Sequence, residues 1–270
     1  PDSLIKINLS KSIGALESDR DVQFINKAVV KLYQDNNYIE DLVINESGNY
    51  LSTIYPNIDK EYKITVDVDK MKFVESYTNV PDKQNIFDIE AHVDSIVIND
   101  GFGEYVEQET TIDISFNDPP NETNYYILSF TRLFPELRYS ETTTSYDTIG
   151  YSYRAIEFES NSKVLETDYM YEAYFPGYTF SDKLFDGKKC SIHSELYYYY
   201  DYNDDEVGYW LYVNLHSIDK DYYKYLVSYN DYIESNENPM AEPVIVYGNI
   251  NNGIGLFSSY NTYTDSVYIE

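Results

Sequence analysis

Short runs of alternating apolar and polar residues fill the first eighty positions of the chain. The clearest is residues 62–68, where Tyr62, Ile64 and Val66 share one face. Turn residues at Asn36-Asn37 and Ser47-Gly48-Asn49 separate such runs. A period of two is the pattern of half-buried strands, and several short strands at this spacing are typical of a two-sheet fold. The pattern predicts a small β-sandwich over residues 1–82.

Longer alternating runs follow in residues 83–270, which we expect to form a second, larger β-sandwich. Ile112, Ile114 and Phe116 share a face. The turn Asn117–Asn121 (NDPPN) comes next, because its prolines fix the backbone and supply no donor. Residues 190–200 and 207–216 predict the two strands of one hairpin. Between residues 134 and 162 the pattern weakens and predicts no defined element.

One segment has helical periodicity instead. Apolar residues recur at three- and four-residue spacing from Ile218 to Ile233, and Ser217 or Asp219 is available as N-cap. This predicts one helix over about 218–235, within the second domain. The Gly/Asn-rich closing segment, Pro239–Tyr260, is expected to return three apolar residues to the core: Ile254, Leu256 and Phe257. The predicted fold is therefore mainly β, with two β-sandwich-like domains.

Composition and charge narrow the classes of partner. The 270 residues include 33 tyrosines, which fit half-buried sheet surfaces, and carry a formal net charge of −28. This charge repels phosphate backbones and anionic bilayers, so we expect no nucleic-acid partner. Cys190 is the single cysteine, which excludes an intrachain disulfide. The chain begins at Pro1 without a leader and has no membrane-spanning run, so we expect a trimmed mature chain.

Two groups of residues are candidates for metal binding. Asp201, Asn203 and Asp205 begin like an EF-hand calcium loop, but Glu206 and Tyr212 stand where that loop needs its glycine and its bidentate carboxylate. A solvated acidic turn is the competing interpretation. His193, Glu195 and His216 would form a two-histidine, one-carboxylate site of a metal-dependent hydrolase if the hairpin register brought them together; histidines with a structural role at strand ends are commoner.

Other polar residues suggest no catalysis. Glu90, His92 and Asp94 alternate onto one strand face, which an exposed polar surface explains better than a metal site. The chain contains no nucleophile elbow, phosphate loop or dinucleotide fingerprint. We therefore expect no enzyme activity and no cofactor, with calcium as the minor alternative.

Aromatic residues give the better functional hypothesis. Tyr197, Tyr199, Trp210 and Tyr212 would share one surface of the predicted hairpin, and an exposed surface of this kind suits a glycan or peptide ligand. Burial beneath the Tyr-rich helix is the competing interpretation, because that helix needs a surface to pack against.

The N-terminal region resembles a known β-sandwich. Lys27–Leu32 (KAVVKL), Gly48-Asn49-Tyr50 and Tyr62–Val66 (YKITV) are similar to the prealbumin-like or carboxypeptidase-regulatory-like fold, although Lys27 stands where that family commonly has Gly. The resemblance implies a noncatalytic prealbumin-like or Ig-like module over residues 1–82.

Four ordered motifs in the second domain resemble domain-of-unknown-function family 4249. They are Phe116–Tyr126 (FNDPPNETNYY), Leu184–Gly187 (LFDG), Leu211–Tyr225 and Glu242–Phe257 (EPVIVYGNINNGIGLF). Members are outer-membrane lipoproteins of Bacteroidota, often encoded beside TonB-dependent receptors, and no catalytic residues are established for them.

The resemblance implies a cellular location and a role. We expect a noncatalytic envelope lipoprotein at the outer membrane that acts as an accessory or binding subunit of a TonB-dependent receptor. Contact with the membrane would be through a lipid anchor absent from this chain. A free-standing glycan- or peptide-binding module with the aromatic surface is the alternative.

Overall fold

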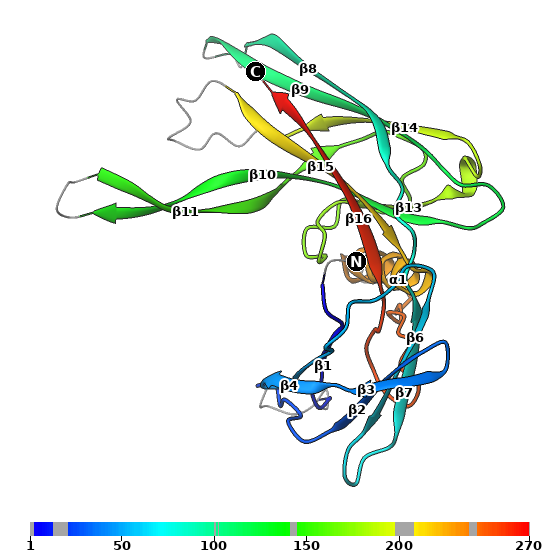
Figure 1. Ribbon diagram of the computed structural model, residues 1–270. Helices are drawn as coiled ribbons and strands as arrows, with labels where there is room; N and C mark the ends of the chain where they lie inside the picture. Colours follow the sequence, from blue (N-terminus) through cyan, green and yellow to red (C-terminus); the bar gives the residue numbers. More distant parts are fainter. Residues whose placement is uncertain are drawn as a thin grey trace. The chain divides into compact units, whose positions relative to one another are not determined.

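The computed structural model describes residues 3–12, 21–99, 101, 103–140, 145–197, 208–237 and 242–269. These residues are mainly β, as the sequence predicts, and include one α-helix. They form two compact units: unit 1 is Pro1–Asp82 with Ser217–Asn261, and unit 2 is Lys83–His216 with Thr262–Glu270 (Figure 1).

Unit 1 is built from two antiparallel sheets. One has the order β1-β5-β4 and the other β3-β2-β6-β7. The strands are β1 Lys6–Asn8, β2 Val29–Gln34, β3 Asn37–Asp41, β4 Val43–Glu46, β5 Asn49–Leu51, β6 Glu61–Asp67 and β7 Val74–Asn79. The alternating apolar residues of the strands point into the core. Tyr62, Ile64 and Val66 of β6 are buried there with Leu32 of β2 and Tyr50 of β5. The two sheets thus enclose one apolar core, in the manner of a sandwich.

Unit 2 is also built from two sheets, with the orders β11-β10-β15-β16 and β12-β14-β9-β8; β13 joins the first through β10. Its elements are β8 Ile86–Asn99, β9 Glu104–Asn117, β10 Tyr125–Ser140, β11 Ser145–Ile156, β12 Phe158–Glu159, β13 Tyr178–Ser181, the 3₁₀ turn η1 Asp182–Leu184, β14 Lys189–Leu196, β15 Tyr209–Ile218 and β16 Tyr260–Ile269. The core lies between the sheets and includes the predicted Ile112, Ile114 and Phe116, none more than 1% exposed.

The helix α1 spans Lys220–Glu237. Its N-cap is Asp219, whose carboxylate accepts a hydrogen bond from the Tyr222 amide at 2.7 Å, one of the two caps that the sequence offered. The sequence grouped this helix with residues 83–270. The contacts group it with unit 1, because the buried Asp219 also binds Thr78 and the Ser259 amide there.

The predicted hairpin of residues 190–200 and 207–216 is wrong. β14 pairs with β9 and β12, whereas β15 belongs to the sheet of β10 and β16. Both strands bury one face in the same core, but from opposite sheets. Adjacency in sequence suggested pairing, but strands that follow each other along the chain can belong to different sheets.

Residues 134–162, where the sequence predicted no element, contain a long hairpin. β10 and β11 pair from Phe130↔Ile156 to Ser140↔Ser145, with a bulge opposite Glu136 and Leu137. Its distal part runs out past the other strands of unit 2 (Figure 1). Pro135 within β10 and the exposed aromatic residues hid the strand pattern.

The closing segment returns fewer apolar residues to the core than the sequence predicted. Phe257 is 7% exposed and packs in unit 1, and Leu256 is half-buried. Ile254, however, is 92% exposed. The side chain of Asn249 explains this: its amide oxygen accepts from the Phe257 amide, its nitrogen donates to the Phe257 carbonyl, and the loop between them turns outward.

Candidate functional site

The most extensive candidate site is an exposed apolar surface on one sheet of unit 2. It lies on the side of the sheet β11-β10-β15-β16 that faces away from the core. We call it the aromatic outer face; its members are Leu133, Leu137 and Tyr139 of β10, Tyr146, Tyr151 and Tyr153 of β11, Trp210 and Tyr212 of β15, and Tyr268 of β16. Tyr151 is 66% exposed and Trp210 is 52% exposed.

Strand register puts these residues on one side. Leu133 lies opposite Tyr153, and Tyr139 lies opposite Tyr146, across the β10–β11 ladder. Paired residues project to the same side of a sheet, and so do residues two apart along a strand. The alternating members of β10 and β11 therefore form one continuous surface.

Ring contacts extend this surface across the sheet. Tyr153 and Tyr212 meet edge to face with centroids 5.1 Å apart, and Trp210 meets Tyr268 in the same way at 5.4 Å. Such contacts hold the exposed rings in place, which lowers the entropy that a ligand must remove on binding.

On the same side of the sheet, toward the C-terminal end of β15, the exposed aromatic residues give way to buried polar ones. His216 lies between Ser129, at 2.9 Å from its Nε2, and Thr262, at 2.8 Å from its Nδ1, and its ring stacks on Phe175 with centroids 3.8 Å apart. Burial lowers the pKa of His216 to about 3, because no carboxylate among these neighbours offsets the cost of a buried charge. This histidine is neutral and has a structural role.

The aromatic residues predicted from the sequence fall in different places. Trp210 and Tyr212 belong to the aromatic outer face, and Trp210 is not buried under the helix. Tyr197 follows β14 of the other sheet and is 40% exposed; Tyr199 lies outside the described residues. The weak pattern of residues 134–162 did not predict the β10–β11 tyrosines as part of a surface, although Tyr151 and Tyr153 do alternate.

The predicted metal ligands are not brought together. His193 and Glu195 project outward from β14, whereas His216 projects from the opposite surface of the sandwich on β15. His193 instead contacts Asp113 of β9 at 2.9 Å. Asp201, Asn203 and Asp205 lie outside the described residues. Glu90, His92 and Asp94 form an exposed strand face.

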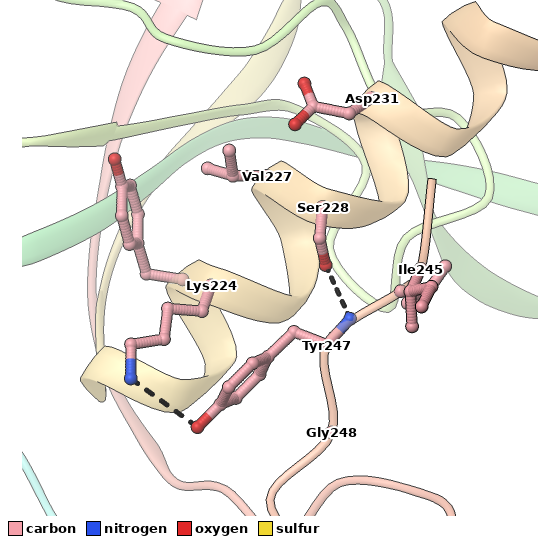
Figure 2. Close-up of a pocket in the computed structure, with 9 residues that line it drawn as sticks. Lys224, Val227, Ser228, Asp231, Ile245, Tyr247 and Gly248 are labelled. Carbon is pink, nitrogen blue, oxygen red and sulfur yellow. Dashed lines mark hydrogen bonds between the residues drawn. The ribbon is translucent and has the colours of Figure 1, made fainter. Parts of the chain in front are cut away.

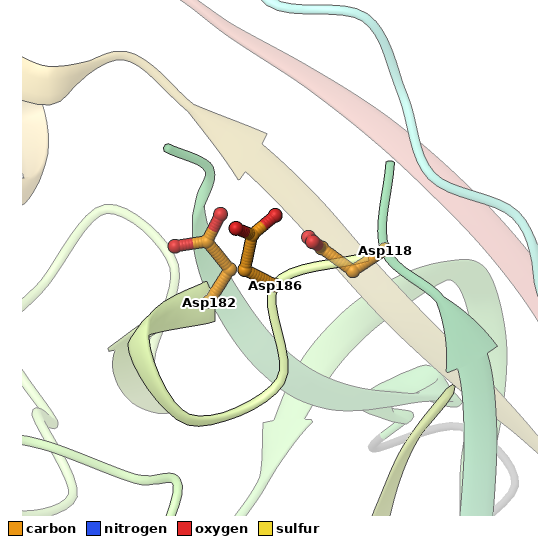
Figure 3. A group of neighbouring side chains, drawn as sticks. All are labelled: Asp118, Asp182 and Asp186. Atoms are coloured by element: carbon orange, nitrogen blue, oxygen red, sulfur yellow. The ribbon is translucent and has the colours of Figure 1, made fainter. Parts of the chain in front are cut away.

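The sequence did not single out a group of three carboxylates in unit 2, which Figure 3 shows converging. Oxygen atoms of Asp118, Asp182 and Asp186 lie within 4.8 Å of one another. Burial, and then the charges of the other two, raise the pKa of Asp182. Three carboxylates supply the oxygen atoms that a hard cation such as Ca²⁺ takes.

Hydrogen bonds within the protein already explain this cluster. Asp118 accepts from the Tyr126 hydroxyl at 2.6 Å and from the Gly187 amide at 3.0 Å, and Asp186 accepts from the Asn121 amide at 3.1 Å. The carboxylates thus tie the turn after β9 to the turn after η1. These turns carry the motifs FNDPPN and LFDG, so their acidic residues have a structural role.

Replacing Gly187 by alanine should destabilise unit 2 by about 1–3 kcal/mol. Gly187 has a φ of +67°, and an added Cβ would lie 2.7 Å from the Cβ of Pro120. Gly103→Ala is the matched control, since an added Cβ there meets nothing within 4 Å. Denaturant midpoints, followed by tryptophan fluorescence, measure both variants. Equal midpoints would contradict the structural role of this turn.

A hollow lies in unit 1, between α1 and the segment that follows it. It has a volume of about 540 Å³ and is lined by Tyr223, Lys224, Val227, Ser228, Asp231 and residues 245–248 (Figure 2). Its polar groups already hold the segment: the Tyr247 amide donates to the Ser228 hydroxyl at 2.8 Å, and the Tyr247 hydroxyl donates to Asp221 at 2.7 Å. The hollow is therefore a by-product of how this segment is fixed to the helix.

Comparison with protein families gives one match. Residues 2–266 match the family described as Domain of unknown function (DUF4249). The chain belongs to this family. A search of curated proteins and a search of solved structures found no match.

In this DUF4249 chain, the motifs that carry the resemblance make structural contacts. FNDPPN and LFDG bind each other through Asp118 and Asp186, and the Asn249 side chain fixes the closing segment. The aromatic outer face lies mostly outside these motifs. No helix in the described part of the chain combines the length and apolar character needed to cross a bilayer.

Proposed function

We propose that this DUF4249 chain is a noncatalytic binding subunit of the cell envelope. It acts beside an outer-membrane receptor of the TonB-dependent class, held at the membrane by a lipid anchor attached to a segment outside this sequence. The observation that supports this most is the aromatic outer face of unit 2, because monomeric soluble proteins rarely expose so extensive an apolar surface.

The composition of that face suits a protein partner. Tyrosine, tryptophan and arginine are enriched at the centres of protein interfaces, where rigid rings bury much area at low entropy cost. The face contains six tyrosines and the single tryptophan of the chain. The chain's charge of −28 favours a partner whose surrounding surface is basic.

The residue types that most often act in catalysis are engaged in structural contacts in this fold, which supports a binding role. His216 is enclosed by neutral partners, and the carboxylates of Asp118 and Asp186 are engaged with backbone amides. Burial raises the pKa of the Cys190 thiol to about 12, which opposes a role as nucleophile. Each of these groups is accounted for by the fold.

Removing the rings of Trp210 and Tyr268 should weaken partner binding roughly 10- to 100-fold, as expected for truncation at the centre of an interface. The assay is co-purification of the natural chain from native outer membranes, with the receptor identified by mass spectrometry and its affinity then measured with purified components. Leu184→Ala, which shortens a 63% exposed residue outside the face, is the control. Recovery of no outer-membrane protein, or full binding by the double variant, would contradict the proposal.

A free-standing glycan- or peptide-binding module is the second candidate, favoured by the exposure of Trp210. Because Trp210 is the sole tryptophan, its emission reports directly on this face. Titration of the purified chain with neutral polysaccharides and with mixed peptides distinguishes the two. A saturable change in emission that Tyr268→Ala abolishes while Trp210 is kept, without any membrane partner, would support the module over the receptor subunit.

A further inference from the structure

We propose that β11 pairs antiparallel with β11 of a second copy of this chain, which joins two aromatic outer faces into one surface. Self-association of this kind does not depend on what the face binds. Three features support it: the position of β11 in its sheet, the charge of the β10–β11 hairpin and the placement of Asp147 and Arg154.

β11 is the last strand of its sheet. Among the described residues it pairs with β10 on one side, and no described strand pairs with its other side. The distal part of the hairpin has side chains exposed on both faces. A two-stranded ribbon of this kind is marginally stable by itself, and its outer edge offers unpaired N–H and C=O groups to a further strand.

The hairpin is electrically neutral on a strongly acidic chain. Residues 125–156 contain three of the four arginines, and these balance three acidic residues: Arg132, Arg138 and Arg154 against Glu136, Glu141 and Asp147. Two chains of charge −28 repel each other, but repulsion between exposed charges is screened beyond roughly 8–10 Å at physiological salt. The hairpin is therefore a place where two copies can approach with little electrostatic cost.

The charges on β11 are complementary to a reversed copy of the same strand. In a two-fold antiparallel register that pairs Asp147 with Arg154 of the second copy, the opposite pair forms as well. Both residues are exposed and lie on the same side of the hairpin, since their partners on β10 are Arg138 and Arg132. Opposite charges directly across a ladder stabilise pairing, and like charges oppose it.

The same register keeps the aromatic outer faces together. Thr148 then lies across from Tyr153 of the second copy, and the bulge at Ile149 falls near the two-fold axis in both strands. A two-fold axis perpendicular to a sheet leaves each side of the sheet facing the same way. The tyrosines of β11 in both copies would thus lie next to each other, on a surface about twice as wide.

Charged residues and bulges on an edge strand can also prevent pairing, so a monomeric chain is the contrary expectation. Sedimentation equilibrium of the full chain, over concentrations on the order of 1–100 μM, distinguishes the two. We expect the natural chain to be a dimer. Asp147→Arg and Arg154→Asp should each weaken association at least roughly 10-fold, because each sets like charges opposite each other at two places. The double variant Asp147→Arg/Arg154→Asp should restore it.

Arg138→Asp is the matched control. It sets like charges across the β10–β11 ladder, just as Asp147→Arg does, but leaves the charges of the outer edge unchanged. The dimer should persist in this variant. A natural chain that stays monomeric throughout the range, or single reversals that the double variant does not rescue, would overturn the proposal. Retained binding to the aromatic outer face by a monomeric chain would leave the proposed function standing and refute the pairing alone.

Discussion

Phe116→Ala is expected to destabilise unit 2 by about 3–5 kcal/mol, the range for truncating a fully buried phenylalanine. The ring is fully buried in the core between the two sheets. Its centroid lies 5.1 Å from that of Tyr126 and 5.7 Å from that of Phe185, both edge to face. Alanine would remove these contacts and leave a cavity in the core.

This loss should move the thermal midpoint of unit 2 by roughly 6–20 °C, since about 1 kcal/mol corresponds to 2–4 °C for a unit of this size. Trp210 belongs to unit 2, so its fluorescence follows the transition of that unit. Phe87→Ala is the matched control: the same substitution on β8 of the same unit, at a side chain that is 52% exposed. Similar losses in both variants would mean that Phe116 is not central to the core.

Lowering the pH from 6.5 to 4.5 should cost unit 2 about 2 kcal/mol through His216 alone. The pKa of this histidine is lowered to about 3 in the folded state, from an ordinary value of 6.5. Between these two values the unfolded chain binds a proton that the folded chain does not. Stability from His216 is therefore present above pH 6.5 and is lost as the pH falls toward 3.

Comparison of variants isolates this effect. Burial raises the pKa of Asp182, which acts in the opposite direction, so the pH dependence of the natural chain alone mixes several groups. His216→Gln should be less stable at pH 7 but should lose less on acidification. His92→Gln, at an exposed position, should follow the natural chain. Denaturant midpoints at several pH values provide the measurement, and an unchanged slope in His216→Gln would refute the assignment.

Binding by the aromatic outer face and pairing by the outer edge of β11 can be tested separately in this DUF4249 chain. The first test asks what the face binds, which Trp210 reports directly. The second asks whether two copies join their hairpins, which Asp147 and Arg154 test by charge reversal. Because the substitutions for the two tests lie on different strands, either answer can be obtained without the other.

Local pattern in the sequence determined the buried faces of the strands. The alternation of Ile112, Ile114 and Phe116 predicted which side enters the core. The helical spacing from Ile218 predicted α1, with Ser217 and Asp219 as the two candidate caps, of which Asp219 is the cap. These follow from the sequence because a strand's faces repeat every two residues and a helix's face every three or four, whatever the rest of the chain does. The four ordered motifs likewise identified the family.

Only the tertiary structure decided which strands pair. β14 and β15 are neighbours in sequence but lie in opposite sheets, so His193 and His216 separate and Tyr197 leaves the surface of Trp210. In contrast, β10 and β16 join β15 across long stretches of chain. β11, which pairs with β10, brings Tyr153 to it, and β16 brings Tyr268. Pairing depends on which apolar faces can share a core, a property of the whole chain that no local pattern contains. The aromatic outer face therefore depends on which strands pair, while the buried and exposed sides of each strand follow from the sequence.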